Sequence, residues 1–131
     1  MDTTQLKSHS QNYQDIFALV CSDYKQDGTF IDIGCSYPNH FSNVVSLIKQ
    51  FNWNGLGFDL KTELDWHWED YKGNIAVYEL NVVEHIDKLN KLISERFSEG
   101  VIDYLNVDID GYPCQYAIEN LDLYKHSLVK R

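Results

Sequence analysis

Long apolar runs are missing from this 131-residue sequence. No stretch approaches the ~20 consecutive apolar residues that a membrane-spanning helix needs. The polar start MDTTQLKSHSQ also lacks the apolar segment of a signal peptide. We therefore expect a soluble, cytoplasmic protein with no membrane as a partner.

Cysteine is scarce, and the three that occur, Cys21, Cys35 and Cys114, form no CxxC pair. This spacing predicts neither a zinc site nor a redox-active dithiol, and reduced thiols are the simplest interpretation. Internal repeats, low-complexity tracts and linkers rich in Pro, Gly or Ser are missing too. The length then fits one domain over residues 1–131.

Positive charge is in short supply. The chain has 11 Lys and Arg against 20 Asp and Glu, which gives a formal net charge of -9, and no run of basic residues marks a local patch. Because such a chain repels a phosphate backbone, we expect no nucleic acid partner. Apolar residues, by contrast, make up 44% of the sequence, enough for a packed core.

Short segments rich in β-branched and aromatic residues alternate with segments of helical spacing. Buried strands are predicted at 29–34, 55–60, 74–80 and 101–109. Helices are predicted at 12–24, 41–51, 83–97 and about 115–124. Pro38 is expected just before the second helix, where its fixed φ suits the first turn. Gly111 and Pro113 are expected to form a turn before the last helix.

This alternation predicts an α/β fold, a Rossmann-like and mostly parallel sheet with helices on both faces. In such sheets, ligands bind beyond the carboxyl ends of the strands, at the point where the strand order reverses. The informative residues of the sequence fall at those ends.

The turn after the first strand reads Asp32-Ile33-Gly34-Cys35-Ser36-Tyr37-Pro38. Gly34 would let a ligand approach the backbone, and an acid such as Asp32 can hold a charged amine. An ordinary connection from a strand to a helix would explain the same residues.

Asp59 ends the second predicted strand, about 25 residues after Gly34. At this spacing a carboxylate can accept hydrogen bonds from a ribose diol. A helix N-cap or a solvated strand end is the alternative. Together with the turn after the first strand, Asp59 predicts a nucleoside-binding crevice, and the lack of GxGxxG argues against a pyrophosphate cradle.

Asp108 and Asp110 lie two residues apart at the end of the fourth predicted strand, so they point the same way if the chain is extended. Such a pair can bind a divalent cation or orient a substrate hydroxyl. The alternative is that one acid caps the next helix and the other faces water.

The five histidines form no HxH or HxxxH pattern and predict no metal site. His40 alone falls on the loop after the first strand, and a surface or helix-start position is its simpler interpretation. Trp66 and Trp68 flank His67 in what we interpret as a polar loop. They could stack on an adenine or a sugar, although packing over the sheet edge is the more ordinary interpretation.

Four ordered motifs resemble one protein family. They are SQNYQD at 10–15, FIDIGCSYPNHFSN at 30–43, WNGLGFDL at 53–60 and IDYLNVDIDG at 102–111. Their order and spacing are similar to those of the FkbM-type S-adenosylmethionine (SAM)-dependent methyltransferases, over nearly the whole chain from about Ser8 to Tyr124. The resemblance implies a class I methyltransferase sheet of about four strands in the order 3-2-1-4.

The resemblance also implies a cofactor and residues that bind it. SAM would be the cofactor, with Asp32 and Gly34 lining its methionine end. Asp59 would hold the ribose hydroxyls, and Asn81 would lie near the adenine.

The acidic pair Asp108 and Asp110 matches the family's pair near the point of methyl delivery, so the resemblance implies a catalytic role for both. Asp108 would act as the base or, with Asp110, as a ligand of a divalent cation, the second cofactor candidate. Gln14 and Asp15 match an upstream QD whose role is either functional or only structural.

This sequence departs from the family pattern in three ways. Pro38 stands where many members have a second Gly, and Asp110 replaces the commoner Glu. A complete class I fold would also continue into a fifth strand and an antiparallel pair, so we expect an incomplete fold with an exposed fourth strand.

The expected activity is O-methylation of a small molecule or a sugar, in doubt for so short a chain. The alternatives are a non-catalytic SAM-fold module that docks or oligomerises through the exposed edge of its fourth strand, and a metal-dependent sugar-binding domain.

Overall fold

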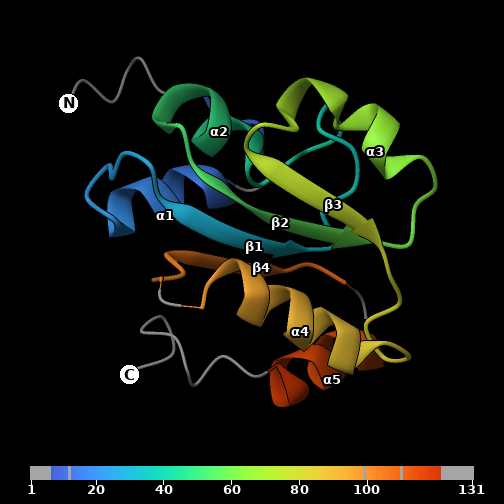
Figure 1. Ribbon diagram of the computed structural model, residues 1–131. Helices are drawn as coiled ribbons and strands as arrows, with labels where there is room; N and C mark the ends of the chain where they lie inside the picture. The colour runs from blue at the N-terminus through green and yellow to red at the C-terminus, as the bar shows by residue number, and fades with distance from the viewer. Residues whose placement is uncertain (1–6, 12, 99, 110, 122–131) are drawn as a thin grey trace.

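The computed structural model describes residues 7–11, 13–98, 100–109 and 111–121. The strands in this part of the chain are β1 Thr29–Ile33, β2 Asn54–Asp59, β3 Ile75–Glu79 and β4 Tyr104–Val107. They pair in parallel throughout, in the order β3-β2-β1-β4 (Figure 1). The predicted α/β fold and its strand order are confirmed.

Helices cover both faces of the sheet (Figure 1). One face packs against α1 Gln14–Cys21, α2 Val45–Phe51 and the short α3 Leu64–His67, which a 3-10 turn, η2 Glu69–Tyr71, follows. The other face packs against α4 Ile86–Arg96 and α5 Tyr112–Asn120. We call these the α1–α3 face and the α4–α5 face.

Side chains of β1 alternate between the two faces because successive residues of a strand point in opposite directions. Phe30 is buried in the core of the α1–α3 face, whereas Ile31 and Ile33 are buried in the core of the α4–α5 face. Asp32 therefore points to the α1–α3 face with Phe30. The register aligns Asp32 with Gly57 of β2 and Asn106 of β4, so all three residues share that face.

The second helix begins later than predicted. Phe41 has a φ of 50°, in the left-handed region that ends helical geometry, and α2 starts only at Val45. The Ser42 hydroxyl accepts hydrogen bonds from the amides of Val44 and Val45, at 3.2 and 3.1 Å, which supports the first turn from outside the helix. The expectation that Pro38 directly precedes the helix was wrong.

The segment interpreted as a polar loop contains α3 and η2. Trp68 is buried beside Ile75 and Val77 of the edge strand β3, and its indole N–H donates to the Ser36 carbonyl at 2.8 Å. Trp66 points outward and is 71% exposed. One Trp therefore packs over the sheet edge, and the other stays at the surface.

The last strand and helix also differ from expectation. β4 is limited to four residues, and α5 begins at Tyr112 with Pro113 in its first turn rather than after a Gly-Pro turn. Proline is tolerated there because the first helical amides have no partner within the helix. All three cysteines are free, and within the described ranges no helix is long and apolar enough to cross a membrane.

Candidate functional site

Polar side chains gather where β1, β2 and β4 end. On the α1–α3 face, the Asn106 amide of β4 donates to Asp32 Oδ1 of β1 at 2.7 Å. Asp59 ends β2 on the same face, because it stands two residues after Gly57. Asp108 follows β4 with the same alternation. The strand pattern thus brings three carboxylates to one end of one face.

Asp32 is fully buried, and its other oxygen, Oδ2, has no hydrogen-bond partner within the described part of the chain. Burial raises the pKa of the Asp32 carboxyl to about 7, and the negative charges of Asp108 and Asp59 add to this rise. The hydrogen bond from Asn106 acts in the opposite direction. An unpaired buried acceptor is costly, so this position favours a positively charged or proton-donating neighbour.

Gly34 lies at the turn between these groups, with a φ of 89°. A Cβ added there would lie 2.2 Å from the backbone oxygen of Asp108, so no side chain fits. The sequence suggested that the missing Cβ makes room for a ligand. In the structure the closest neighbour of that position is the chain leaving β4, whose Asp108 amide donates to the Ile33 carbonyl at 2.8 Å.

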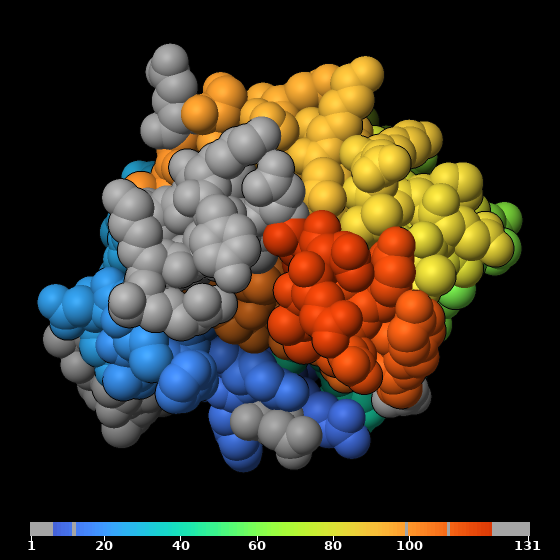
Figure 2. Space-filling view, turned by 90° about the horizontal axis from the view of Figure 1, so that it is seen from below, coloured from blue at the N-terminus to red at the C-terminus, as the bar shows by residue number. Residues whose placement is uncertain are grey.

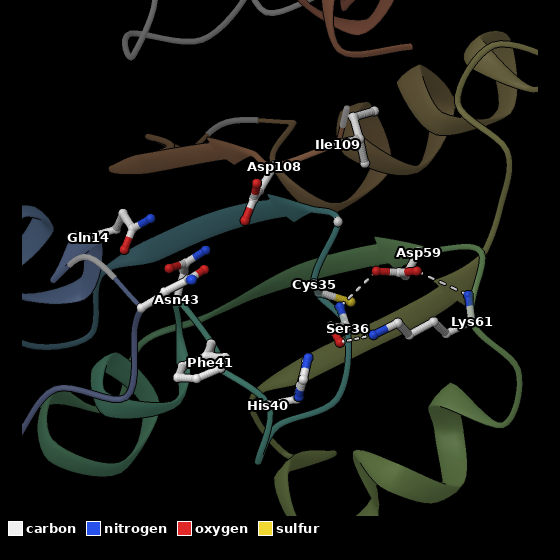
Figure 3. A pocket seen from close by; sticks show the side chains of 12 residues that line it. Gln14, Cys35, Ser36, His40, Phe41, Asn43, Asp59, Lys61, Asp108 and Ile109 are labelled. Atoms are coloured by element: carbon white, nitrogen blue, oxygen red, sulfur yellow. Dashed lines mark hydrogen bonds between the residues drawn. The ribbon is translucent and has the colours of Figure 1, made fainter. Parts of the chain in front are cut away.

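Asp59 is held by the loops around it (Figure 3). Its Oδ2 accepts the Ser36 amide at 2.8 Å, and its Oδ1 accepts the Lys61 amide at 3.0 Å. The Lys61 ammonium donates to the Ser36 hydroxyl at 2.5 Å. Since a carboxylate offers about four lone-pair sites, each oxygen of Asp59 can accept a further hydrogen bond.

A cavity of about 380 Å³ opens beside this carboxylate (Figure 3). Most of the side chains around it are polar. It is lined by Gln11, Gln14, Gly34, Cys35, Ser36, His40, Phe41, Asn43, Asp59, Lys61, Asp108 and Ile109. We call it the polar cavity.

A second cavity of about 230 Å³ lies on the α4–α5 side of the same strand ends. Its lining is mainly apolar: Ile33, Gly34, Phe58, Asp59, Leu60, Leu80, Asn81, Val82, Ile109 and Pro113. Asn81 Oδ1 accepts the amides of Val83 and Glu84, at 2.9 and 3.1 Å, which orders the loop after β3. We call this the apolar cavity.

Asp59, Gly34 and Ile109 line both cavities, so the two are neighbours that share a wall. Of the predicted cofactor residues, Gly34 and Asp59 thus stand at the junction, and Asn81 lies in the apolar cavity. Asp32 is buried beneath the strand ends and lines neither cavity. Asp108 reaches the polar cavity.

Only one residue of the predicted metal-binding pair, Asp108, lies in the described part of the chain. Asp108 is exposed at the polar cavity, and Asp110 lies outside the described residues. No three His, Cys, Asp or Glu residues of the described chain come together as a possible metal site. A cation held by Asp108 and Asp110 stays a prediction.

The upstream Gln-Asp pair divides into two roles. Asp15 is buried and accepts the Ser8 hydroxyl at 2.7 Å and the His9 amide at 2.8 Å, so it ties the N-terminal segment to α1. Gln14 lines the polar cavity. The motif at 10–15 contained this signal, but its role could not be assigned from the sequence.

Sequence reasoning also missed Ser36, Lys61, Phe41 and Asn43 as cavity residues. Lys61 follows Asp59 by two residues, and this short spacing was the available signal. Cys35 lines the polar cavity as well, and burial together with the charges of Asp32 and Asp59 raises the pKa of its thiol. The thiol is therefore protonated and poorly reactive.

Comparisons of the chain with protein-family models, with curated proteins and with solved structures give no match. Fold and site together define an α/β protein with a crevice at the carboxyl ends of parallel strands. The resemblance to the FkbM-type methyltransferases stays a prediction from the four sequence motifs.

Proposed function

We propose that this chain binds SAM in the two adjoining cavities and serves O-methylation of a small molecule or a sugar. The observation that carries the proposal is the position of Asp59, whose carboxylate stands between a polar and an apolar cavity where β1 and β2 end. A nucleoside joined to a charged amino acid has the same division into apolar and polar parts.

The shapes support this assignment part by part. The apolar cavity suits a flat adenine, with the Asn81 amide at its wall. Asp59 keeps lone pairs free for a ribose diol at the junction. The polar cavity would then receive the amino-acid end of the ligand.

Charge supports a ligand with positive groups. Asp32, Asp59 and Asp108 gather at one end of the sheet, and the chain as a whole carries -9. SAM carries a sulfonium and an ammonium, whereas the pyrophosphate of a dinucleotide would be repelled. The residues present therefore fit SAM.

Bound SAM would supply an electrophilic methyl group. The protein would then align an acceptor hydroxyl and take its proton. Asp108 is our choice for the base because it is exposed at the polar cavity. Its carboxylate would accept the proton directly, or would hold a divalent cation together with Asp110.

Calorimetric titration with SAM tests this proposal, with Asp59→Asn as the informative variant. Loss of a charged acceptor for the ribose hydroxyls should weaken binding about 10- to 100-fold. Asp70→Asn is the matched control, since Asp70 is exposed on η2 and lines neither cavity. Wild-type protein that ignores SAM at millimolar concentration would refute the proposal.

A second candidate function, a non-catalytic interaction module, has its own observation. Among the described residues, β4 pairs only with β1, and every residue of β4 is half-buried. Phe17 and Val20 of α1 are exposed as well, and Figure 2 shows part of β4 between α1 in blue and α5 in red. Light scattering after size exclusion would favour this function if the chain oligomerises and ignores SAM.

A further inference from the structure

Two aromatic side chains stand together at the polar cavity. His40 and Phe41 belong to the segment between β1 and α2, and their ring centroids are 5.5 Å apart at an angle of 60°. Both line the cavity, on the side opposite Asp108 in Figure 3. Phe41 leaves 60% of its surface exposed.

Folding alone gives little reason for this arrangement at Phe41. A bulky residue held at a φ of 50° is strained, and its exposed ring recovers only part of that cost through burial. Phe51, at the end of α2, is 2% exposed and shows how a core Phe is placed.

The rest of the polar cavity offers hydrogen bonds rather than apolar contacts. Gln11 and Asn43 contribute amides, and Asp108 contributes a carboxylate. Asn43 is buried, and its Oδ1 has no hydrogen-bond partner in the described chain. An apolar flat ring would cover Phe41 but leave these groups unpaired, whereas a ring with several hydroxyls would match both.

We propose that Phe41, with His40 beside it, is a stacking platform for a polyhydroxylated ring, such as a pyranose or a cyclitol. The C–H face of the ring lies on Phe41, and its hydroxyls meet the amides and Asp108. Assigning this ring as the methyl acceptor rests on the proposed function, but the binding itself does not.

Saturation-transfer NMR tests the platform with three probes: methyl α-D-glucopyranoside, myo-inositol and catechol. Phe41→Ala should weaken binding of the polyol probes about fivefold to tenfold, since stacking on one ring carries most of the apolar contact. Phe17→Ala is the matched control, because Phe17 is 68% exposed on α1 and lines neither cavity. Phe41→Tyr keeps the ring and should bind like wild type.

The readings separate this inference from the proposed function. Binding of either polyol that is lost in Phe41→Ala and kept in Phe41→Tyr and Phe17→Ala supports the platform and identifies which ring it takes, even if SAM does not bind. Three results would overturn the platform. The polyols fail to bind the wild type, they bind Phe41→Ala as tightly as Phe17→Ala, or they bind the wild type more weakly than catechol does. SAM titration of the wild type and of Phe17→Ala, a variant outside both cavities, keeps the proposed function separately testable.

Discussion

The two faces of the sheet differ sharply at the carboxyl ends of the same strands. Asp32 and Asn106 are the last residues of β1 and β4 that point to the α1–α3 face, and the polar cavity lies beyond them. On the α4–α5 face, Ile33 and Phe58 line the apolar cavity. Because side chains alternate along each strand, the polar groups lie on one face and the apolar lining on the other. Asp59 is the acidic residue that both cavities share.

The two faces also differ in how their buried residues at the strand ends affect the stability of the fold. Ile33 and Phe58 are buried in an apolar core, which favours folding. Asp32 is equally buried but keeps an oxygen without a partner and a pKa raised to about 7. The α1–α3 face therefore carries a polar arrangement that folding does not require, which is typical of a binding site.

Gly34 joins the two faces, and Gly34→Ala should destabilise the fold more than any other change proposed here. The added Cβ would meet the Asp108 carbonyl at 2.2 Å on a backbone with a φ of 89°, so we expect a loss of about 3 kcal/mol or more. Urea unfolding measures it. Gly73→Ala is the control, because a Cβ there meets nothing within 4 Å. Equal losses in the two variants would contradict the close approach.

Asp32→Asn should remove a pH-dependent cost from the α1–α3 face. Because burial raises the pKa of Asp32 from 3.8 to about 7, the folded state holds a proton that the unfolded state releases in this window. The stabilising effect of the protonated Asp32 is therefore fully present below about pH 4. As pH rises to about 7, the free energy of unfolding falls by on the order of 4 kcal/mol.

The variant lacks this titration, so its stability relative to wild type should rise between pH 4.5 and pH 8. Urea unfolding of both proteins across that range provides the measurement. A difference that stays constant with pH would show that Asp32 ionises normally.

Asn81→Ala should have the smallest effect and should act on the apolar cavity. Losing the acceptor for the amides of Val83 and Glu84 should cost about 1 kcal/mol. Asn81→Asp keeps an acceptor oxygen and should retain most of the stability. Thermal unfolding compares the two, and an Asp variant as unstable as the Ala variant would argue against the hydrogen bonds.

The sheet could be predicted from the sequence because its signals are local. The β1 segment carries β-branched residues and the β2 segment carries Leu56 and Phe58, and their acids fall at or next to the strand ends by simple counting. Asp32 and Asp59 were therefore located correctly along the chain. Their different surroundings, one buried and one at a junction, depend on packing and were not predictable.

The remainder of the site depends on contacts between distant segments. Phe41 fitted a helical pattern, yet its left-handed backbone is set by the loop around the polar cavity. Gln14 lies 20 residues before Gly34 and reaches the same cavity only because α1 packs beside β1. Neither spacing nor composition carries that information.

An NMR titration with S-adenosylhomocysteine, read amide by amide, tests the central claim most directly. The account predicts chemical-shift changes concentrated at Gly34, Ser36, Lys61 and Asn81, where Asp59 joins the two cavities. Changes confined to Phe17 and its neighbours on α1, or no change at saturating ligand, would contradict it.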